Sequence, residues 1–312
     1  MLLHSSQSET WSRERQTVAY RHIEVSPVAG ALGAEIAGMD LTEPFGNDVF
    51  SELHDAFMEH LVLFFRGQTI TPAQHVAFAR RFGEIDPNPF VRPLELETLP
   101  DQPEVLNIVK DASDLSINFG GLWHHDVSHR ERPNLGSVLV AREVPKAGGD
   151  TLWANQYLAY DTLSEGLKAT LETMKAVHST VRDLNDDQLA ANYGVAKDTV
   201  NFESVRRAED KSEKIENVHP VVRTHPETGR KCLFVNRSFT QRFDGWTREE
   251  SLPLLDYLWV HGARPEFTVR WRWRAGDAAL WDNRCTMHNA VNDYAGQRRV
   301  MNRVAIHGDR PH

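Results

Sequence analysis

The 312-residue sequence predicts a mainly β fold, a barrel or jelly roll decorated by helices, on three observations. Many short apolar runs are separated by turns that contain glycine, proline or asparagine. Helical periodicity is confined to a few segments, mostly in the first half of the chain. No dinucleotide-binding glycine motif, no P-loop and no internal repeat of about 20–50 residues occurs. We therefore expect one domain over residues 17–312, preceded by a mobile polar arm over residues 1–16.

The first third of the chain predicts small strands followed by two helices. Residues 20–41 contain short apolar runs broken by proline and glycine, which predicts strands and turns. Residues 47–61 carry apolar side chains at helical spacing, and the run LVLFF over residues 61–65 predicts a buried strand. Thr71 is a suitable N-cap, and the helix that it begins is expected to end near Phe82.

The middle of the chain predicts a loop, two strands and a long helical segment. Four prolines over residues 86–100 indicate a loop, and loops often line functional sites. Residues 105–109 and 135–143 read as strands. Residues 156–177 have helical periodicity with a break near Ser164. The polar, charged residues that follow, 183–217, are interpreted as a surface insertion or lid.

The last third predicts several short strands and one helix. The helix is expected over residues 248–261, and a hairpin turn over residues 224–229. The expected strands cover residues 219–224, 232–235, 267–273, 278–281 and 298–306.

Composition excludes some classes of function. The formal net charge of −9 argues against non-specific nucleic-acid binding, although a few buried arginines can still hold one anionic ligand. No apolar run reaches the roughly 18 residues of a membrane span, and the N-terminus has no apolar core of signal-peptide length. We therefore expect a cytoplasmic protein with no membrane partner. The two cysteines, Cys232 and Cys285, are expected to be reduced.

Three residues form a candidate metal site. On a strand, residues i and i+2 point to the same face, so in the segment WHHDV His124 and Asp126 would project together while His125 points away. A second histidine from a distant segment would complete a facial triad typical of iron(II) oxygenases, and His288 is the candidate. The H-x-D pair alone is a weak signal, because most of the fifteen histidines must be incidental.

Two arginines form a candidate anion site. If the segment QRRVMNR is a strand, Arg299, Met301 and Arg303 share one face and Arg298 points away. Two guanidinium groups inside a barrel are costly unless anions meet them. The pair therefore indicates a dicarboxylate cosubstrate and an anionic substrate. The alternative is that both form structural ion pairs, with Asp277, Asp282 or Asp293 as partners.

Matching segments from about residue 20 to residue 310 resemble the taurine dioxygenase group, the TauD/TfdA family of 2-oxoglutarate-dependent iron(II) dioxygenases. In chain order these segments are ITPAQHVAFARRFGEI, WHHDV, VPKAGGDTLWAN, HPVVRTHPETGRKCLFVN, RPEFTVRWRW, WDNRCTMHNAVNDY and QRRVMNR. The co-ordered set is far more specific than any single motif.

The resemblance implies a double-stranded β-helix core, related to the cupins, with flanking α-helices. It also implies Fe(II), O₂ and the cosubstrate 2-oxoglutarate, and dimers or tetramers of the chain. Carried over residue by residue, the iron ligands are His124, Asp126 and His288. Thr151 and Arg299 match the residues that bind the far carboxylate of 2-oxoglutarate.

On the substrate side, Arg303 matches the arginine that binds a sulfonate, and Phe239 matches an aromatic residue of the pocket. The chain departs from taurine-using members at Asn88 and Val91, where they have histidine and tyrosine, and near Gly120, where they have asparagine. The resemblance therefore implies hydroxylation of a small organic anion, with a sulfonate such as taurine or a relative as the expected substrate. An alkyl sulfate ester or an aryloxyalkanoate is the alternative, and a non-catalytic 2-oxoglutarate sensor is the alternative from another class.

Overall fold

The structure is a computed structural model, and it describes residues 20–87, 97–114, 118, 120–180, 190 and 214–312. The predicted arm over residues 1–16 and the candidate residues Asn88 and Val91 lie outside the described residues. Most of the predicted lid over residues 183–217 does so too, and its last two residues belong to a strand.

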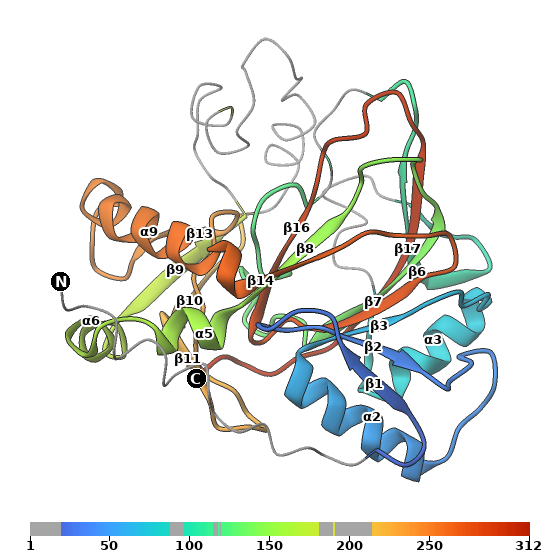
Figure 1. The fold of residues 1–312 in the computed structure, drawn as a ribbon. Coiled ribbons are helices and arrows are strands. Elements are labelled where there is room, and N and C mark those ends of the chain that lie inside the picture. Colours follow the sequence, from blue (N-terminus) through green and yellow to red (C-terminus); the bar gives the residue numbers. More distant parts are fainter. Residues whose placement is uncertain (1–19, 88–96, 115–117, 119, 181–189, 191–213) are drawn as a thin grey trace, which may run out of the picture.

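The larger of two sheets that enclose the site contains nine strands (Figure 1). Their order across the sheet is β1 (Glu24–Pro27), β2 (Ala34–Ala37), β3 (Val62–Phe65), β15 (Ala278–Asp282), β7 (Gly136–Glu143), β17 (Arg299–Ile306), β6 (Gln102–Lys110) and β5 (Glu97–Leu99), and β4 (Ile85–Asp86) pairs with the end of β17. All neighbours are antiparallel except β2 and β3. The long central strands alternate between two buried faces, one toward the helices and one toward the smaller sheet.

The smaller sheet contains three strands, in the order β14 (Thr268–Trp271), β8 (Thr151–Asn155) and β16 (Thr286–Ala290). One apolar cluster joins the inner faces of the two sheets, with Trp281 of β15 against Trp153 of β8 at 6.0 Å between ring centroids. β15 and β16 follow one another in the chain but belong to different sheets. The mainly β fold with helices is therefore as expected, and two sheets face each other across the site.

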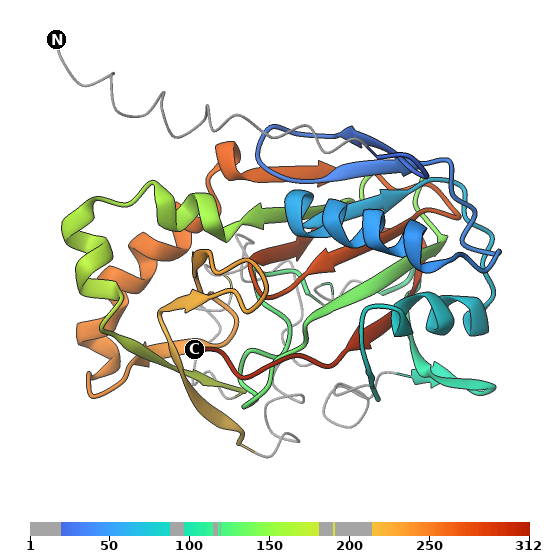
Figure 2. The same ribbon diagram turned by 90° about the horizontal axis from the view of Figure 1, so that it is seen from below.

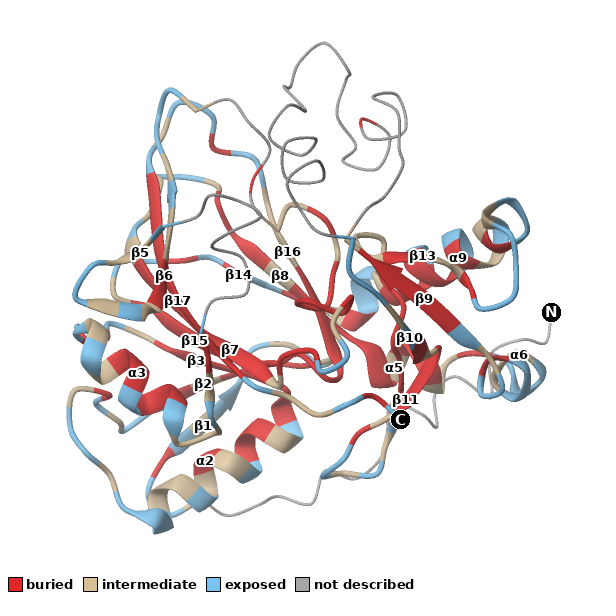
Figure 3. Ribbon diagram, turned by 180° about the vertical axis from the view of Figure 1, so that it is seen from behind, coloured by how far each residue is buried: buried red, intermediate tan, exposed pale blue. Residues whose placement is uncertain are grey.

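Helices α2 (Asn47–His60) and α3 (Pro72–Arg80) lie together on the outer side of the larger sheet (Figures 1 and 2). Figure 3 shows their buried sides turned toward the strands and their other sides exposed. Thr71 caps α3 as expected, since its hydroxyl accepts the Gln74 N–H at 3.2 Å and Gln74 accepts the Thr71 N–H at 2.8 Å. Leu61, with φ 65°, ends α2 so that the strand can begin at Val62.

The remaining elements form a lobe beside the two sheets (Figure 1). They are α5 (Gln156–Asp161), α6 (Glu165–Leu171), β9 (Lys175–Ser179), β10 (Glu216–Pro220), β11 (Val222–Thr224), β12 (Lys231–Leu233), β13 (Thr240–Phe243), α9 (Arg248–Gly262) and the short 3₁₀ helix η2 (Pro265–Phe267). In the described part of the chain, no helix is long and apolar enough to cross a membrane.

One secondary-structure prediction is partly wrong. The expected helix over residues 156–177 does break at Ser164, which caps α6, but the helix ends at Leu171. Residues 175–179 are instead strand β9, which pairs on both sides, with β10 and with β13. These pairings involve segments distant in the chain, so tertiary pairing overrides the local periodicity.

Candidate metal centre

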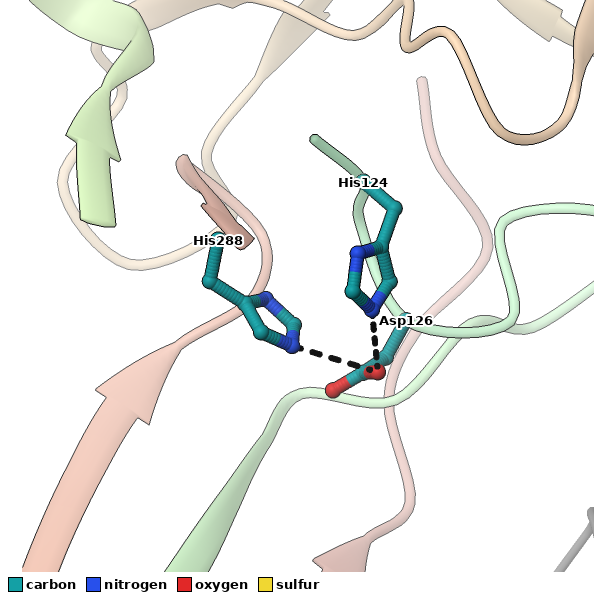
Figure 4. Close-up of side chains that lie close together, drawn as sticks. All are labelled: His124, Asp126 and His288. Atoms are coloured by element: carbon teal, nitrogen blue, oxygen red, sulfur yellow. Dashed lines mark ion pairs between the residues drawn. The ribbon is translucent and has the colours of Figure 1, made fainter. Parts of the chain in front are cut away.

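Three buried side chains converge between the two sheets (Figure 4). The Nε2 atoms of His124 and His288 lie 3.5 and 3.6 Å from the Oδ1 atom of Asp126. All three ligand atoms lie within 4.8 Å of one another, so one ion can contact them all. The structure thus brings together the two-histidine, one-carboxylate set that the sequence predicts.

The ligand-bearing segment is only partly the strand that was expected. His124 forms an isolated bridge with His288, with N–H···O distances of 3.1 and 2.9 Å. The chain then turns, and Val127 adopts a positive φ of 44°. The predicted direction is nevertheless right for His125. Its Nδ1 donates to the Asn283 carbonyl at 3.1 Å, and its ring packs on Phe234 at 4.6 Å, away from the triad.

The electrostatics favour the metal-binding forms of these groups. Burial raises the pKa of Asp126, but Arg303 and then His288 lower it more, so the pKa lies well below its usual range. Burial holds the pKa of His288 well below its usual value, so this imidazole is neutral. The Nδ1 atom of His124 donates to the Leu122 carbonyl at 2.6 Å, so Nε2 is the ring nitrogen that faces Asp126.

The donor set fits a divalent ion. Asp126 is completely buried, and in the described structure its carboxylate oxygens meet Arg303 and the two histidines but make no hydrogen bond of regular geometry. Buried carboxylates normally satisfy their lone pairs, and those that do not often ligate metals. Two imidazole nitrogens and one carboxylate suit iron(II) and leave further positions on the ion for other ligands.

A second group, His225, Asp282 and Cys285, also has ligand atoms within 4.8 Å, but its charges are already matched. Arg284 binds both Asp282 oxygens, at 2.9 and 2.7 Å. The Nδ1 atom of His225 accepts the Thr228 N–H, so its Nε2 carries the proton that faces Asp282. A cation there would meet a guanidinium group and an N–H, so this group is structural.

A cavity beside the triad is lined by both sheets. From β17 it is lined by Arg299, Met301 and Arg303, as strand alternation predicts, and from β8 by Thr151. Arg298 points away and pairs with exposed Asp111 and Glu143.

Arg299 carries a buried charge that its neighbours Asp150 and Tyr294 compensate only in part. The side chain is buried, its Nε donates to the Gly149 carbonyl at 3.1 Å, and its Nη2 has no hydrogen-bond partner in the described structure. Burial lowers its pKa, which reflects the cost of the charge. The hydroxyl oxygen of Thr151 accepts the Trp273 indole N–H at 3.0 Å, so its own hydrogen is free to donate. An N–H fork and a hydroxyl on one cavity suit a carboxylate.

The alternative partners proposed for the two arginines are all engaged elsewhere. Asp277 pairs with Arg66, Asp282 with Arg284, and Asp293 with Arg270. Arg303 does form an ion pair, but with a residue that the sequence did not indicate. Its Nη2 lies 2.6 Å from Oδ2 of the candidate ligand Asp126, and its Nε and Nη2 reach the Ser137 hydroxyl at 3.1 and 3.0 Å.

Comparison with known proteins agrees with this site. The chain matches the family described as "Taurine catabolism dioxygenase TauD, TfdA family" over residues 24–305. The chain belongs to the TauD/TfdA family. It is 36% identical over 292 residues to the "Alkylsulfatase" of Acinetobacter baylyi, covering 93% of this chain and 86% of that protein. It is 36% identical to the "Alpha-ketoglutarate-dependent sulfate ester dioxygenase" of Pseudomonas putida, covering 93% and 91%.

The fold agrees as well. A solved structure of a putative alpha-ketoglutarate-dependent taurine dioxygenase from Burkholderia xenovorans superposes with a TM-score of 0.75 at 34% identity, covering 93% of this chain and 94% of that chain. The predicted family and its jelly-roll fold are therefore confirmed, and the protein is a 2-oxoglutarate-dependent dioxygenase of the TauD/TfdA family. Membership implies iron, 2-oxoglutarate (alpha-ketoglutarate) and O₂.

On the substrate side, the structure brings Phe239 close to the metal centre of this TauD/TfdA chain. Its ring centroid lies 6.5 Å from that of His124 and 4.8 Å from that of His129, which the sequence reasoning did not single out. Gly120 also lines the cavity, with φ +76°, and a Cβ there would lie 3.2 Å from the His124 ring. The position therefore offers backbone and no polar side chain beside this ligand.

Proposed function

We propose that this TauD/TfdA enzyme hydroxylates alkyl sulfate esters at the carbon next to the ester oxygen, with His124, Asp126 and His288 as the iron ligands. The observation that supports the reaction type best is one cavity bordered by His124 and His288, which flank the buried carboxylate of Asp126, and by the buried guanidinium of Arg299, whose Nη2 has no hydrogen-bond partner in the described structure. Each of these groups is costly alone, and an iron ion with 2-oxoglutarate would satisfy both.

Arg299 and Thr151 would hold the far carboxylate of 2-oxoglutarate. The guanidinium supplies two N–H groups in a fork, and the threonine hydroxyl supplies a third donor. Both residues border the cavity that the triad also borders, so a short dicarboxylate can reach from these donors to the metal centre.

The proposed substrate class follows from the charges at the cavity and from the absence of acceptors for an ammonium group among its described lining residues. Arg303 supplies the positive charge on the metal side of the cavity, where an anionic head group would lie. Apart from the metal ligands, none of the described residues that line the cavity has a carboxylate or amide side chain to bind an ammonium group. Taurine carries an ammonium group and an alkyl sulfate does not, and the two relatives named above act on sulfate esters by their names.

The residues of this chain would place and shield the substrate. Arg303 attracts the sulfate head, Phe239 and Trp281 provide apolar surface for the chain, and the buried walls exclude bulk water. Iron with O₂ and 2-oxoglutarate supplies the oxidising power that converts C–H to C–OH, and 2-oxoglutarate becomes succinate and CO₂. The hydroxylated ester then breaks its C–O bond to give an aldehyde and hydrogen sulfate. Placement matters because a shift of about 1 Å can cost about a hundredfold in rate.

A panel of matched substrates tests this function. Hexyl sulfate, hexanesulfonate, taurine and 2,4-dichlorophenoxyacetate are compared by succinate release, with sulfate and sulfite measured as products. We expect hexyl sulfate to give the highest kcat/KM and stoichiometric sulfate. A higher kcat/KM for hexanesulfonate with sulfite release would favour the sulfonate prediction instead, and preference for taurine would contradict the argument from the missing ammonium ligand. No succinate above the uncoupled background with any member would favour the 2-oxoglutarate sensor.

A further inference from the structure

We infer that Asn283 is a positioning residue for the metal centre, which fixes the direction of the Asp126 carboxylate through the main chain. The inference rests on the proposed role of Asp126 as a metal ligand.

The Asp126 segment has little regular structure to hold it. Strand pairing ends at His124, and residues 126–129 form a turn with Val127 in the left-handed region. The carboxylate itself contacts only Arg303, at 2.6 Å from Oδ2, and the two histidines, at 3.5 and 3.6 Å from Oδ1, among the described residues. The direction of this side chain therefore depends on these contacts and on the position of the main chain that carries it.

The side-chain amide of Asn283 binds that main chain on both of its polar groups. Its Oδ1 accepts the Asp126 N–H at 2.6 Å, and its Nδ2 donates to the Asp126 carbonyl at 3.1 Å and to the Asn134 carbonyl at 3.0 Å. The amide thus makes the two main-chain hydrogen bonds that a neighbouring strand would otherwise make to Asp126. A flipped amide would set its oxygen against two carbonyl oxygens, so this orientation is fixed by the partners.

Asn283 is itself held by its neighbours. It is completely buried, its own N–H donates to the Leu135 carbonyl at 2.8 Å, and its carbonyl accepts the Nδ1–H of His125 at 3.1 Å. These bonds leave the amide no alternative partner, so it can act as a rigid support.

The location of Asn283 joins all three ligands. It lies in the connection between β15 and β16, and β16 carries His288, which bridges to His124. The H-x-D segment is therefore bonded at His124 by strand β16 and at Asp126 by Asn283, which lies in the connection that leads into this strand. Residues that orient a ligand typically change metal affinity about 10–100-fold when removed.

The test compares the metal affinity of Asn283→Ala with that of wild type, using Co(II) as the probe in equilibrium dialysis and following its visible d–d spectrum. We expect binding about 10–100-fold weaker and an altered spectrum. Asn283→Asp is the second variant, because it keeps the shape and the acceptor but offers at most one donor where the amide offers two. We expect it to fold more readily than the alanine variant and to show a smaller loss in the same direction.

Gln68→Ala is the matched control. Gln68 is also a buried amide with three main-chain bonds: to the Leu41 N–H at 2.8 Å and to the carbonyls of Arg66 and Met39 at 3.0 and 3.4 Å. None of these residues lines the cavity. We expect a lower Tm and unchanged Co(II) affinity.

Two outcomes overturn the inference: wild-type Co(II) affinity in the folded Asn283 variants, or an equal loss in Gln68→Ala. Failure of the wild-type protein to bind Co(II) would instead overturn the proposed metal centre.

Discussion

Replacing Arg299 by glutamine tests the cosubstrate site most directly, because this side chain is buried and its Nη2 lacks a hydrogen-bond partner in the described structure. Its guanidinium lies on the cavity wall, and the nearby carboxylate of Asp150 forms its ion pair with Arg270 instead. Glutamine keeps a polar amide of moderate length but removes the charge and the N–H fork.

The expected loss can be worked out from the bonds at stake. Two charge-assisted hydrogen bonds to a carboxylate contribute roughly 1.5–3 kcal/mol each. Together they correspond to a Kd for 2-oxoglutarate raised by about 10²–10⁴-fold. Since the free enzyme already bears the cost of a buried charge, Arg299→Gln should not lower the Tm in the absence of cosubstrate.

The assay is an anaerobic titration of the Fe(II)-loaded enzyme with 2-oxoglutarate, followed by the weak visible charge-transfer band that chelation produces. Arg298→Gln is the control, because this neighbouring arginine is exposed and pairs with Asp111 and Glu143. We expect no change there. An Arg299→Gln variant that binds 2-oxoglutarate as tightly as wild type would refute the assignment, as would an equal loss in Arg298→Gln.

Three further predictions concern single side chains. His124→Ala should abolish Fe(II) binding in equilibrium dialysis. His125→Ala should retain Fe(II) binding but lower the free energy of unfolding in denaturant melts by about 2–4 kcal/mol, because the His125 ring is buried against Phe234. The opposite pattern would mean that His125, and not His124, is the ligand. Arg303→Ala should raise the KM for the organic substrate far more than that for 2-oxoglutarate, and equal effects in steady-state kinetics would reassign it. Burial lowers the pKa of His75 to about 3, with its Nε2 donating to the Val138 carbonyl. The contribution of the neutral His75 ring to the free energy of unfolding is therefore complete above pH 6.5, and up to about 4 kcal/mol of it is lost as the pH falls toward 3. In urea melts, His75→Gln should reduce this dependence of the free energy of unfolding on pH. The same pH dependence in the variant and in wild type would contradict the prediction.

The elements with a strong local signal were predictable. α3 begins where Thr71 and Pro72 indicate, because a capping box is made by residues three positions apart. β17 places Arg299 and Arg303 on one face for the same kind of reason, since strand alternation is local. The expected oligomer and cytoplasmic location stay predictions, because no local signal bears on them here.

The elements that depend on distant partners were not predictable. β8 and β16 pair with each other across more than a hundred residues, and their short sequences carry no clear alternation. Lys175–Ser179 follows a helical segment and continues its periodicity, yet it forms strand β9, which pairs with β10 and β13. In the site, the support by Asn283 and the ion pair of Arg303 with Asp126 arise for the same reason. The local signal that could have indicated Asn283 is an asparagine that follows the end of an expected strand, in the segment WDNR.

The charges around the cavity argue for a substrate with a single net negative charge. Arg299, Arg303 and a divalent iron would bring four positive charges to one water-poor space, and the candidate ligand Asp126 beside the cavity adds one negative charge. A 2-oxoglutarate dianion supplies two more, and an alkyl sulfate monoanion supplies the last, so the ternary complex is neutral. Taurine carries an ammonium group as well as a sulfonate, and none of the described lining residues offers a carboxylate or amide oxygen to accept its N–H groups. Arg303 is ion-paired with Asp126. If Asp126 also binds the metal through one oxygen, its negative charge is divided between the metal and Arg303. The guanidinium would then keep positive charge that attracts an incoming anion. Under the proposed function, charge balance at the metal would favour a monoanionic substrate over a zwitterion, and the panel of hexyl sulfate, hexanesulfonate and taurine tests this.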